Sequence, residues 1–361
     1  MRLLFTTFCF ALGLVQPSAA THPNVVFFLV DDLGWRDVGC FGSSFYDTPN
    51  IDRLAKQGVK FTNAYAACHV CSPTRASILT GKYPARLHLT DWLPGRREFP
   101  FQKFFNAEIH QQLPFGETTL AEALKGHGYT TAIFGKWHLG EEPAGPLSHG
   151  FDVQVPKWNK GWPRAGYHAP FRLEGISGKA GDYLTDRLTD EALKFIEQNK
   201  DKPFFMYFAL NTPHYPYQGY AKWLKHYKDL PYPRNLYAAF VSTYDETIGQ
   251  LLATLDQHGL RKDTILVFQS DHGHSHEERA HFGGGSSGPY RGAKFSMFEG
   301  GLRVPAIVEW PAGITQPRIT EHPAGAVDIF PTLAEVCGLP KSSMLQPQDG
   351  MSLVPLFATE I

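Results

Sequence analysis

The chain alternates between largely apolar runs and segments in which apolar residues recur with helical spacing. The apolar runs predict buried strands at residues 24–30, 59–65, 129–134, 203–210 and 263–270, and a further strand that ends at residue 310. The helical spacing predicts helices at residues 48–55, 118–128, 182–200 and 235–258, and two more that begin near residues 71 and 328. Strands that alternate with helices are typical of an open α/β sheet.

Polar side chains follow four of the predicted strands directly. They are Asp31 and Asp32, Lys136 and His138, His214, and Asp271 and His272. Open α/β sheets bind their ligands at the carboxyl ends of the strands, so these side chains mark a candidate site. Lys136 and His138 are two residues apart, and we therefore expect them to point the same way.

The adjacent carboxylates Asp31 and Asp32 indicate a cation site. Two carboxylates at the end of a buried strand are costly unless a positive charge lies between them. Asp271 is a third carboxylate at a strand end, and oxygen ligands of this kind suit calcium. A solvent-exposed Asp-Asp turn is the competing interpretation.

A second candidate site begins at Cys71, the first residue of the string Cys-Ser-Pro-Thr-Arg. Ser72 is suited to cap a helix, and Pro73 is suited to its first turn because proline lacks the N–H that is unpaired there. Free amides at a helix start favour anions, and the Arg75 fork one turn later suits a tetrahedral oxyanion. The competing interpretation is a buried cysteine before an ordinary helix.

The composition is that of a large globular enzyme. Apolar residues make up 43% of the 361 residues, aromatic residues 14%, and the formal net charge is -1. This balance provides neither the basic surface that nucleic acids require nor a polybasic patch for membranes. We therefore expect no nucleic-acid partner.

The N-terminus has the pattern of a secretory signal. Arg2 precedes an apolar run at residues 3–15, which is too short to span a bilayer comfortably, and the small residues 18–20 form a cleavage site. We expect a signal peptide at residues 1–20 and a secreted or periplasmic protein that begins at residue 21. No later stretch is long and apolar enough to serve as a membrane anchor.

Cysteine and histidine spacing leaves two other metal interpretations open. Cys68 and Cys71 form a Cys-x-x-Cys pair, which could be a redox or metal pair, but no second such pair completes a zinc site. Residues 274–281 are rich in His and Glu, which suits either a zinc site or a solvated loop.

The sequence from Cys71 to Arg86 closely resembles the signature of the type I, formylglycine-dependent sulfatases, which are arylsulfatase-like members of the alkaline phosphatase superfamily. Three further strings match that family's pattern, namely Gly-Lys-Trp-His-Leu-Gly at 135–140, Thr-Pro-His at 212–214 and Tyr-Arg-Gly-Ala-Lys at 290–294. The resemblance covers residues 24–350. It implies that a maturation enzyme oxidises Cys71 to formylglycine, an aldehyde whose hydrate attacks the sulfate ester.

The resemblance also implies a role for each candidate residue. Calcium would be bound by Asp31, Asp32, Asp271, His272 and the oxidised Cys71. The cations Arg75, Lys136 and Lys294 would contact the sulfate, His138 would support the aldehyde hydrate, and His214 would protonate the leaving alcohol. The family commonly has Asp-Asn where this chain has Asp271-His272, so His272 is a departure from the pattern.

The implied fold is an alkaline-phosphatase-like, mixed but mostly parallel sheet flanked by helices, in a catalytic domain at residues 21–361. The small C-terminal antiparallel-sheet domain that is usual in the family would be largely absent. The implied substrate is a sulfated small molecule or glycan, and the region 90–95 resembles sulfatases that degrade polysaccharides. The loops at 87–115 and 158–178 are expected to face it. The alternatives are a phosphonate or phosphodiester hydrolase of the same superfamily, or an inactive secreted glycan-binding remnant.

Overall fold

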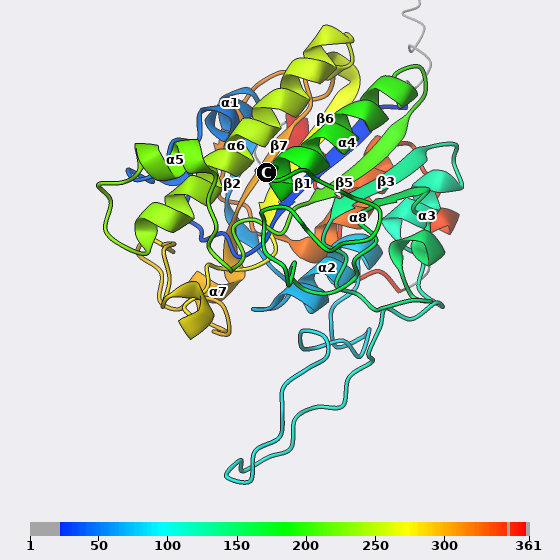
Figure 1. Ribbon diagram of the computed structural model, residues 1–361. Helices are drawn as coiled ribbons and strands as arrows, with labels where there is room; N and C mark the ends of the chain where they lie inside the picture. The colour runs from blue at the N-terminus through cyan, green and yellow to red at the C-terminus, as the bar shows by residue number, and fades with distance from the viewer. Residues whose placement is uncertain (1–21, 345–346, 359–361) are drawn as a thin grey trace, which may run out of the picture.

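A computed structural model describes residues 22–344 and 347–358 and shows helices on both faces of a central sheet (Figure 1). The strands are β1 (Asn24–Val30), β2 (Val59–Tyr65), β3 (Thr130–Gly135), β4 (Val153–Val155), β5 (Phe204–Ala209), β6 (Thr264–Ser270), β7 (Arg303–Glu309), β8 (Arg318–Thr320) and β9 (Ala324–Gly325). They lie in the order β4-β3-β5-β1-β6-β7-β2-β8, and β9 also pairs with β2. The strands pair in parallel except where β7 meets β6 and β2. The predicted mixed, mostly parallel sheet is confirmed.

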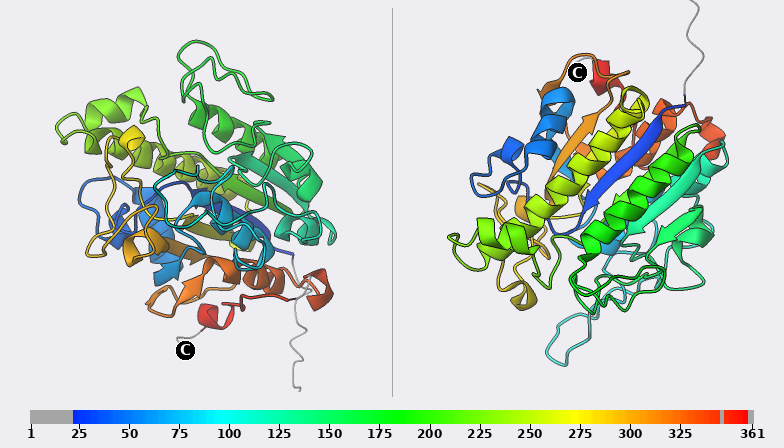
Figure 2. Two further views of the ribbon diagram at one scale, coloured as in Figure 1. Left: turned by 90° about the horizontal axis from the view of Figure 1, so that it is seen from below. Right: turned by 45° about the horizontal axis from the view of Figure 1, so that its top comes forward.

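The central strand β1 is buried on both faces, and its alternate residues pack into two separate cores. Val25 and Phe27 belong to one core, beneath α2 (Cys71–Thr80), α3 (Leu120–Lys125) and α8 (Ile329–Val336). Val26 and Phe28 belong to the other, beneath α1 (Pro49–Gln57), α4 (Leu184–Asn199) and α6 (Arg234–Gln257). Figure 2 shows α4 and α6 lying across one face of the sheet. The helices are α1 (Pro49–Gln57), α2 (Cys71–Thr80), α3 (Leu120–Lys125), α4 (Leu184–Asn199), α5 (Ala221–His226), α6 (Arg234–Gln257), α7 (Glu299–Leu302), α8 (Ile329–Val336) and α9 (Pro355–Ala358).

Strand register brings the predicted site residues together. In the parallel pairing of β1 with β6, Val30 lies opposite Ser270, so the next residues, Asp31 and Asp271, emerge side by side. Neighbouring strands lie about 4.8 Å apart, which places the two carboxylates within reach of a shared cation. The parallel strands β3, β5, β1 and β6 are neighbours and end at the same edge of the sheet.

Several local predictions need correction. The helix predicted at 118–128 spans only Leu120–Lys125, because Thr119 and Glu122 form a capping box at its start and the chain turns at Gly126. Thr48 does not cap α1, since its hydroxyl accepts from the Gly39 N–H instead. The short strands β4, β8 and β9 were not predicted, because two or three residues carry no readable periodicity.

The predicted irregular segment at 87–115 contains neither helix nor strand and projects beyond the body of the protein (Figure 1). Its two ends are anchored by buried leucines, Leu89 and Leu113, whereas Phe104 and Phe105 at its tip are 85% and 92% exposed. The expected signal peptide at 1–20 lies outside the described residues. Among the helices that are described, none has both the length and the apolar character needed to cross a bilayer.

Candidate active site

Cys71 is the first residue of α2 and is 3% exposed. This position places Cys71 beside the free amides and the positive end of the helix dipole, both of which favour an anion. Ser72 does not cap the helix, contrary to prediction; its hydroxyl accepts a hydrogen bond of 3.1 Å from the Leu93 N–H. Helix α2 is thereby tied to the projecting loop.

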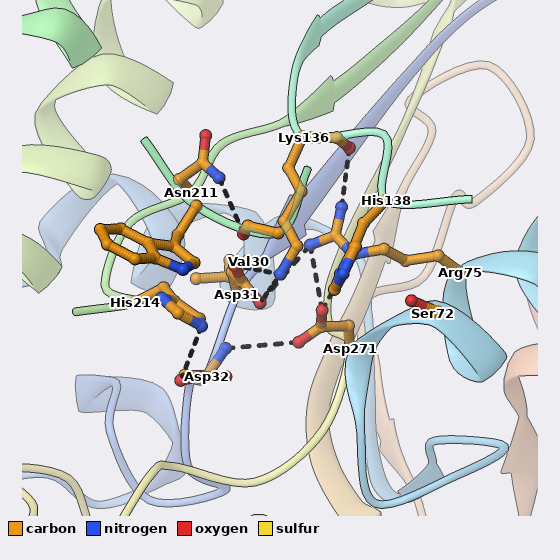
Figure 3. A network of polar contacts seen from close by, with 12 residues as sticks. Val30, Asp31, Asp32, Ser72, Arg75, Lys136, His138, Asn211, His214 and Asp271 are labelled. Atoms are coloured by element: carbon orange, nitrogen blue, oxygen red, sulfur yellow. Dashed lines mark hydrogen bonds and ion pairs between the residues drawn. The ribbon is translucent and has the colours of Figure 1, made fainter. Parts of the chain in front are cut away.

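Arg75 is fully buried and joins the carboxylates at the sheet edge (Figure 3). Its Nε and Nη2 each lie 3.0 Å from Oδ2 of Asp271, and Nη2 lies 3.6 Å from Asp31. Its Nη1 donates to the Lys136 carbonyl at 2.9 Å. Arg75 therefore holds the ends of β1, β3 and β6 together, in addition to any contact with an anion.

Two lysines pair with the two carboxylates that end β1. Lys136 Nζ lies 2.7 Å from Asp31, and both side chains are fully buried. Lys294 Nζ lies 3.1 Å from Asp32 and 3.2 Å from Glu277. Both predicted sulfate-binding lysines therefore lie at the same strand edge, held in place by carboxylates.

The two predicted histidines line the pocket from different strands. Nε2 of His138 lies 2.8 Å from the Leu93 carbonyl, and the residue adopts a left-handed φ of 58°. Nε2 of His214 lies 3.5 Å from Lys294 Nζ. Burial and the ammonium of Lys294 lower the pKa of His214 well below its ordinary value, so the free site favours the neutral imidazole.

The geometry fits a metal ion beside Cys71. Ligand atoms of Asp31, Cys71, Asp271 and His272 all lie within 4.8 Å of one another, and all four residues are buried. Asp32 Oδ1 lies 3.2 Å from His272 Nε2, and within the described part of the chain neither atom makes a hydrogen bond of good geometry. Buried polar atoms without a well-formed hydrogen bond are costly, and coordination of a cation by both atoms would remove that cost.

The electrostatics also favour a positive charge at this point. Burial lowers the pKa of His272, but the Asp271 and Asp32 carboxylates and a hydrogen bond with Cys71 together raise it to about 9. Burial raises the pKa of Asp32 to about 7, even though Lys294 and His272 lower it. For Cys71, burial alone would raise the pKa, but Lys136 and Lys294 hold it well below the ordinary thiol value.

The reaction centre lies at the base of a pocket of about 850 Å³. Cys71, His138, His214 and Lys294 line it, together with Trp92 and Trp162 from the two loops predicted to face the substrate. Glu277, which pairs with Lys294, was not singled out beforehand. It lies in the His- and Glu-rich stretch, where His274 pairs with His276 at 2.8 Å rather than joining the metal cluster described above.

Comparisons with known proteins agree with this geometry. A family model described as Sulfatase matches residues 23–339. N-acetylgalactosamine-6-sulfatase of Mus musculus is 36% identical over 365 residues, which cover 96% of this chain and 68% of that enzyme. Steryl-sulfatase of Mus musculus is 32% identical over 428 residues, which cover 94% of this chain and 65% of that enzyme. The crystal structure of Ps i-CgsB in complex with k-i-k-neocarrahexaose superposes with a TM-score of 0.81 at 30% identity, covering 94% of this chain and 76% of that one.

Proposed function

The chain belongs to the sulfatase family and hydrolyses sulfate esters, and from this premise we propose that it is a secreted, calcium-dependent enzyme that removes sulfate from a carbohydrate by means of a formylglycine made from Cys71. One observation carries the proposal. Three carboxylates and two lysines converge on Cys71 at the base of an open pocket. An ordinary structural cysteine does not need such surroundings.

Two groups that the family implies fit the residues at this point. When present, a hydrated formylglycine supplies a hydroxyl nucleophile, and calcium supplies a positive charge that lowers the pKa of that hydroxyl and polarises the sulfate. Asp31, Asp271 and His272, together with position 71, are placed to hold the ion, and Asp32 offers a further oxygen. Conversion of Cys71 would replace a soft sulfur by oxygen, which calcium prefers.

The lysines are placed to orient the sulfate and to stabilise its charge. Lys136 comes directly after β3, and Lys294 lies in the segment between β6 and α7. Both approach Cys71, and each is held in place by a carboxylate. Because both are buried, their attraction to an anion is much less screened by water than at the surface. Arg75 supports this arrangement from beneath, through its contacts with Asp271 and the Lys136 carbonyl.

His214 is placed to give a proton to the leaving alcohol. It lines the pocket beside Lys294, and its Nδ1 is hydrogen-bonded to the Tyr215 carbonyl at 2.9 Å. That bond fixes a proton on Nδ1 and directs Nε2 into the pocket. The negative charge of a bound sulfate would oppose the effect of Lys294 and favour protonation of Nε2. His138, held by the Leu93 carbonyl, lies on the opposite side, near position 71.

Two relatives favour a sugar as the substrate. The names of the mouse N-acetylgalactosamine-6-sulfatase and of the structure bound to neocarrahexaose both refer to sugars. The pocket walls carry amides, carboxylates and arginines in addition to aromatic rings, including Gln111, Gln112, Asn159, Arg97 and Arg164. Polar groups of this kind suit a hydroxyl-rich ligand better than a sterol.

Sulfate release from a defined panel tests the proposal. The panel contains N-acetylgalactosamine 6-sulfate, a sulfated carrageenan hexasaccharide, a steryl sulfate and a nitrophenyl phosphate diester, each incubated with wild-type protein and with Cys71→Ala. We expect release from at least one sulfated sugar by the wild type only. Faster turnover of the steryl sulfate or the phosphate diester than of every sugar would contradict the proposal.

A further inference from the structure

A second cavity adjoins the active-site pocket along the projecting loop. This cavity of about 560 Å³, the outer groove, is lined by Trp92, Arg97, Phe99, Gln102, Arg279 and Phe295, among others. Four of these residues, Trp92, Arg97, Arg279 and Phe295, also line the pocket that contains Cys71. The two cavities therefore lie next to each other and share one wall.

Two arginines in the shared wall have no acidic partner. The side chains of Arg97 and Arg279 are exposed, and no ion pair or side-chain hydrogen bond to either is found within residues 22–344 and 347–358. The neighbouring Arg96 differs, because its Nε donates to Asp91 at 2.9 Å. A guanidinium without a carboxylate partner keeps its planar fork of donors available for a sulfate or carboxylate group.

The same wall is rich in aromatic rings. Trp92 and Phe295 meet edge to face with centroids 5.4 Å apart, and the Arg96 guanidinium lies over Trp92 at 5.2 Å. Phe99, farther along the loop, lines the outer groove and is 50% exposed. Rings of this kind supply rigid apolar area against which the C–H face of a sugar can pack.

The rest of the pocket lining is mixed in charge, since it contains Lys160 and Arg164 as well as carboxylates. It includes Glu141 and Glu142, of which Glu141 pairs with Lys160 at 3.1 Å and Glu142 accepts from Asn159 at 3.3 Å. These carboxylates disfavour a second anion close to them. Arg97 and Arg279 differ from this part of the wall because they lie together and line both cavities.

We propose that the outer groove is a subsite for an acidic sugar adjacent to the sugar that loses its sulfate. The anionic group of that sugar is a sulfate or a carboxylate. The enzyme would then prefer a multiply charged oligosaccharide to a singly sulfated monosaccharide. This inference rests on the proposed function of the Cys71 pocket, because the outer groove adjoins that pocket.

Binding to the Cys71→Ala protein tests the groove without turnover. The probes are a sulfated carrageenan hexasaccharide, a uronate-containing chondroitin 6-sulfate tetrasaccharide and the monosaccharide N-acetylgalactosamine 6-sulfate, each titrated by calorimetry. We expect Arg97→Ala and Arg279→Ala each to weaken oligosaccharide binding about tenfold, and monosaccharide binding by much less. Added salt should weaken oligosaccharide binding less in these variants than in their parent, because fewer charge pairs remain.

The control is Lys262→Ala, which removes one exposed positive charge just before β6, at the far end of that strand from the site. It should leave all three affinities unchanged, whereas Arg97→Lys should restore part of the loss by keeping the charge. An equal loss for all three probes, or no loss beyond that of Lys262→Ala, would overturn the inference. Sulfate release by the wild type is measured in parallel: its absence would refute the proposed function, and the affinities would still decide the groove.

Discussion

The base of the pocket and its outer wall hold their charges in opposite ways. At the base, Arg75 and Lys136 are fully buried, and each is paired with a carboxylate that follows a strand of the central sheet. On the wall, Arg97 lies in a loop and Arg279 in a single 3-10 turn, Glu278–Ala280; both are exposed and have no acidic partner among the described residues. The base is therefore fixed before a ligand arrives, whereas the wall depends on the ligand to supply its counter-charge.

This difference suggests a division of labour. The sulfate is common to every substrate, so the groups that meet it can be locked in place by strand register and ion pairs. The remainder of the substrate varies, and loops can vary with it at little cost to the fold. Changes at the base should therefore affect all substrates, and changes in the wall should affect only some.

The largest effect is expected at position 71. Cys71→Ala should abolish turnover of every sulfate ester, because it removes the precursor of the nucleophile, and the melting temperature should change little because the side chain is small. Sulfate release and thermal unfolding measure the two effects. Cys40→Ala, which alters a half-buried cysteine that belongs neither to the pocket lining nor to the candidate metal cluster, is the matched control and should keep its activity. Comparable losses in both variants would argue against a special role for Cys71.

The next effect concerns the lysines. Lys136→Met or Lys294→Met removes one charge that stabilises the transition state, a loss of about 2–4 kcal/mol, which corresponds to roughly 30- to 1,000-fold in rate. Sugar sulfates and nitrophenyl sulfate should be affected alike, as measured by kcat/KM. A loss confined to the sugar substrates would show that the lysine contacts the sugar rather than the sulfate.

His214 should separate substrates by their leaving group. His214→Ala should slow sugar sulfates about 10²- to 10⁴-fold, the usual contribution of general acid catalysis. Nitrophenyl sulfate should be slowed much less, since nitrophenolate leaves without a proton. The ratio of kcat/KM values for the two substrates is the measurement. If both fall equally, His214 acts as a sulfate ligand only.

His272 should influence which metal is bound. It places a nitrogen among carboxylate oxygens, and nitrogen ligands suit zinc better than calcium. His272→Asn would supply an oxygen and should raise the affinity for calcium relative to that for zinc, as measured by competitive metal titration of metal-stripped protein. The reverse order of affinities, or no change, would exclude His272 from the metal site.

The smallest effect is expected at Ser72, whose hydrogen bond with Leu93 joins the base of the pocket to the loop in its outer wall. Ser72→Ala removes the acceptor for the Leu93 N–H, a contribution of about 0.5–1.5 kcal/mol. Because the Leu93 carbonyl also meets His138, a loosened loop should raise KM for oligosaccharides more than KM for nitrophenyl sulfate. Ser77→Ala, in the same helix and equally buried, is the control, and its hydroxyl has no hydrogen-bond partner among the residues that the structure describes. Indistinguishable KM values for the two variants would show that the link is structural only.

The sequence was informative where buried strands fix positions and less so in the loops. The adjacency of Asp31 and Asp271 could be predicted because both follow buried parallel strands, whose register is set by packing on two faces. The contacts of Leu93 with Ser72 and His138 could not be predicted, because they use the Leu93 backbone N–H and carbonyl, which any residue possesses. Glu277 was missed because its partner, Lys294, comes from a separate loop, and loop conformation leaves no periodic signal.

The most direct test of the account follows the modification of Cys71 and the activity together. The protein is produced with graded amounts of the formylglycine-generating enzyme, and mass spectrometry measures the fraction of aldehyde in the peptide that contains residue 71. Sulfate release from the best sugar substrate is measured on the same samples. The account predicts a rate proportional to the aldehyde fraction and close to zero without it. Full activity in protein whose Cys71 remains a thiol would contradict it.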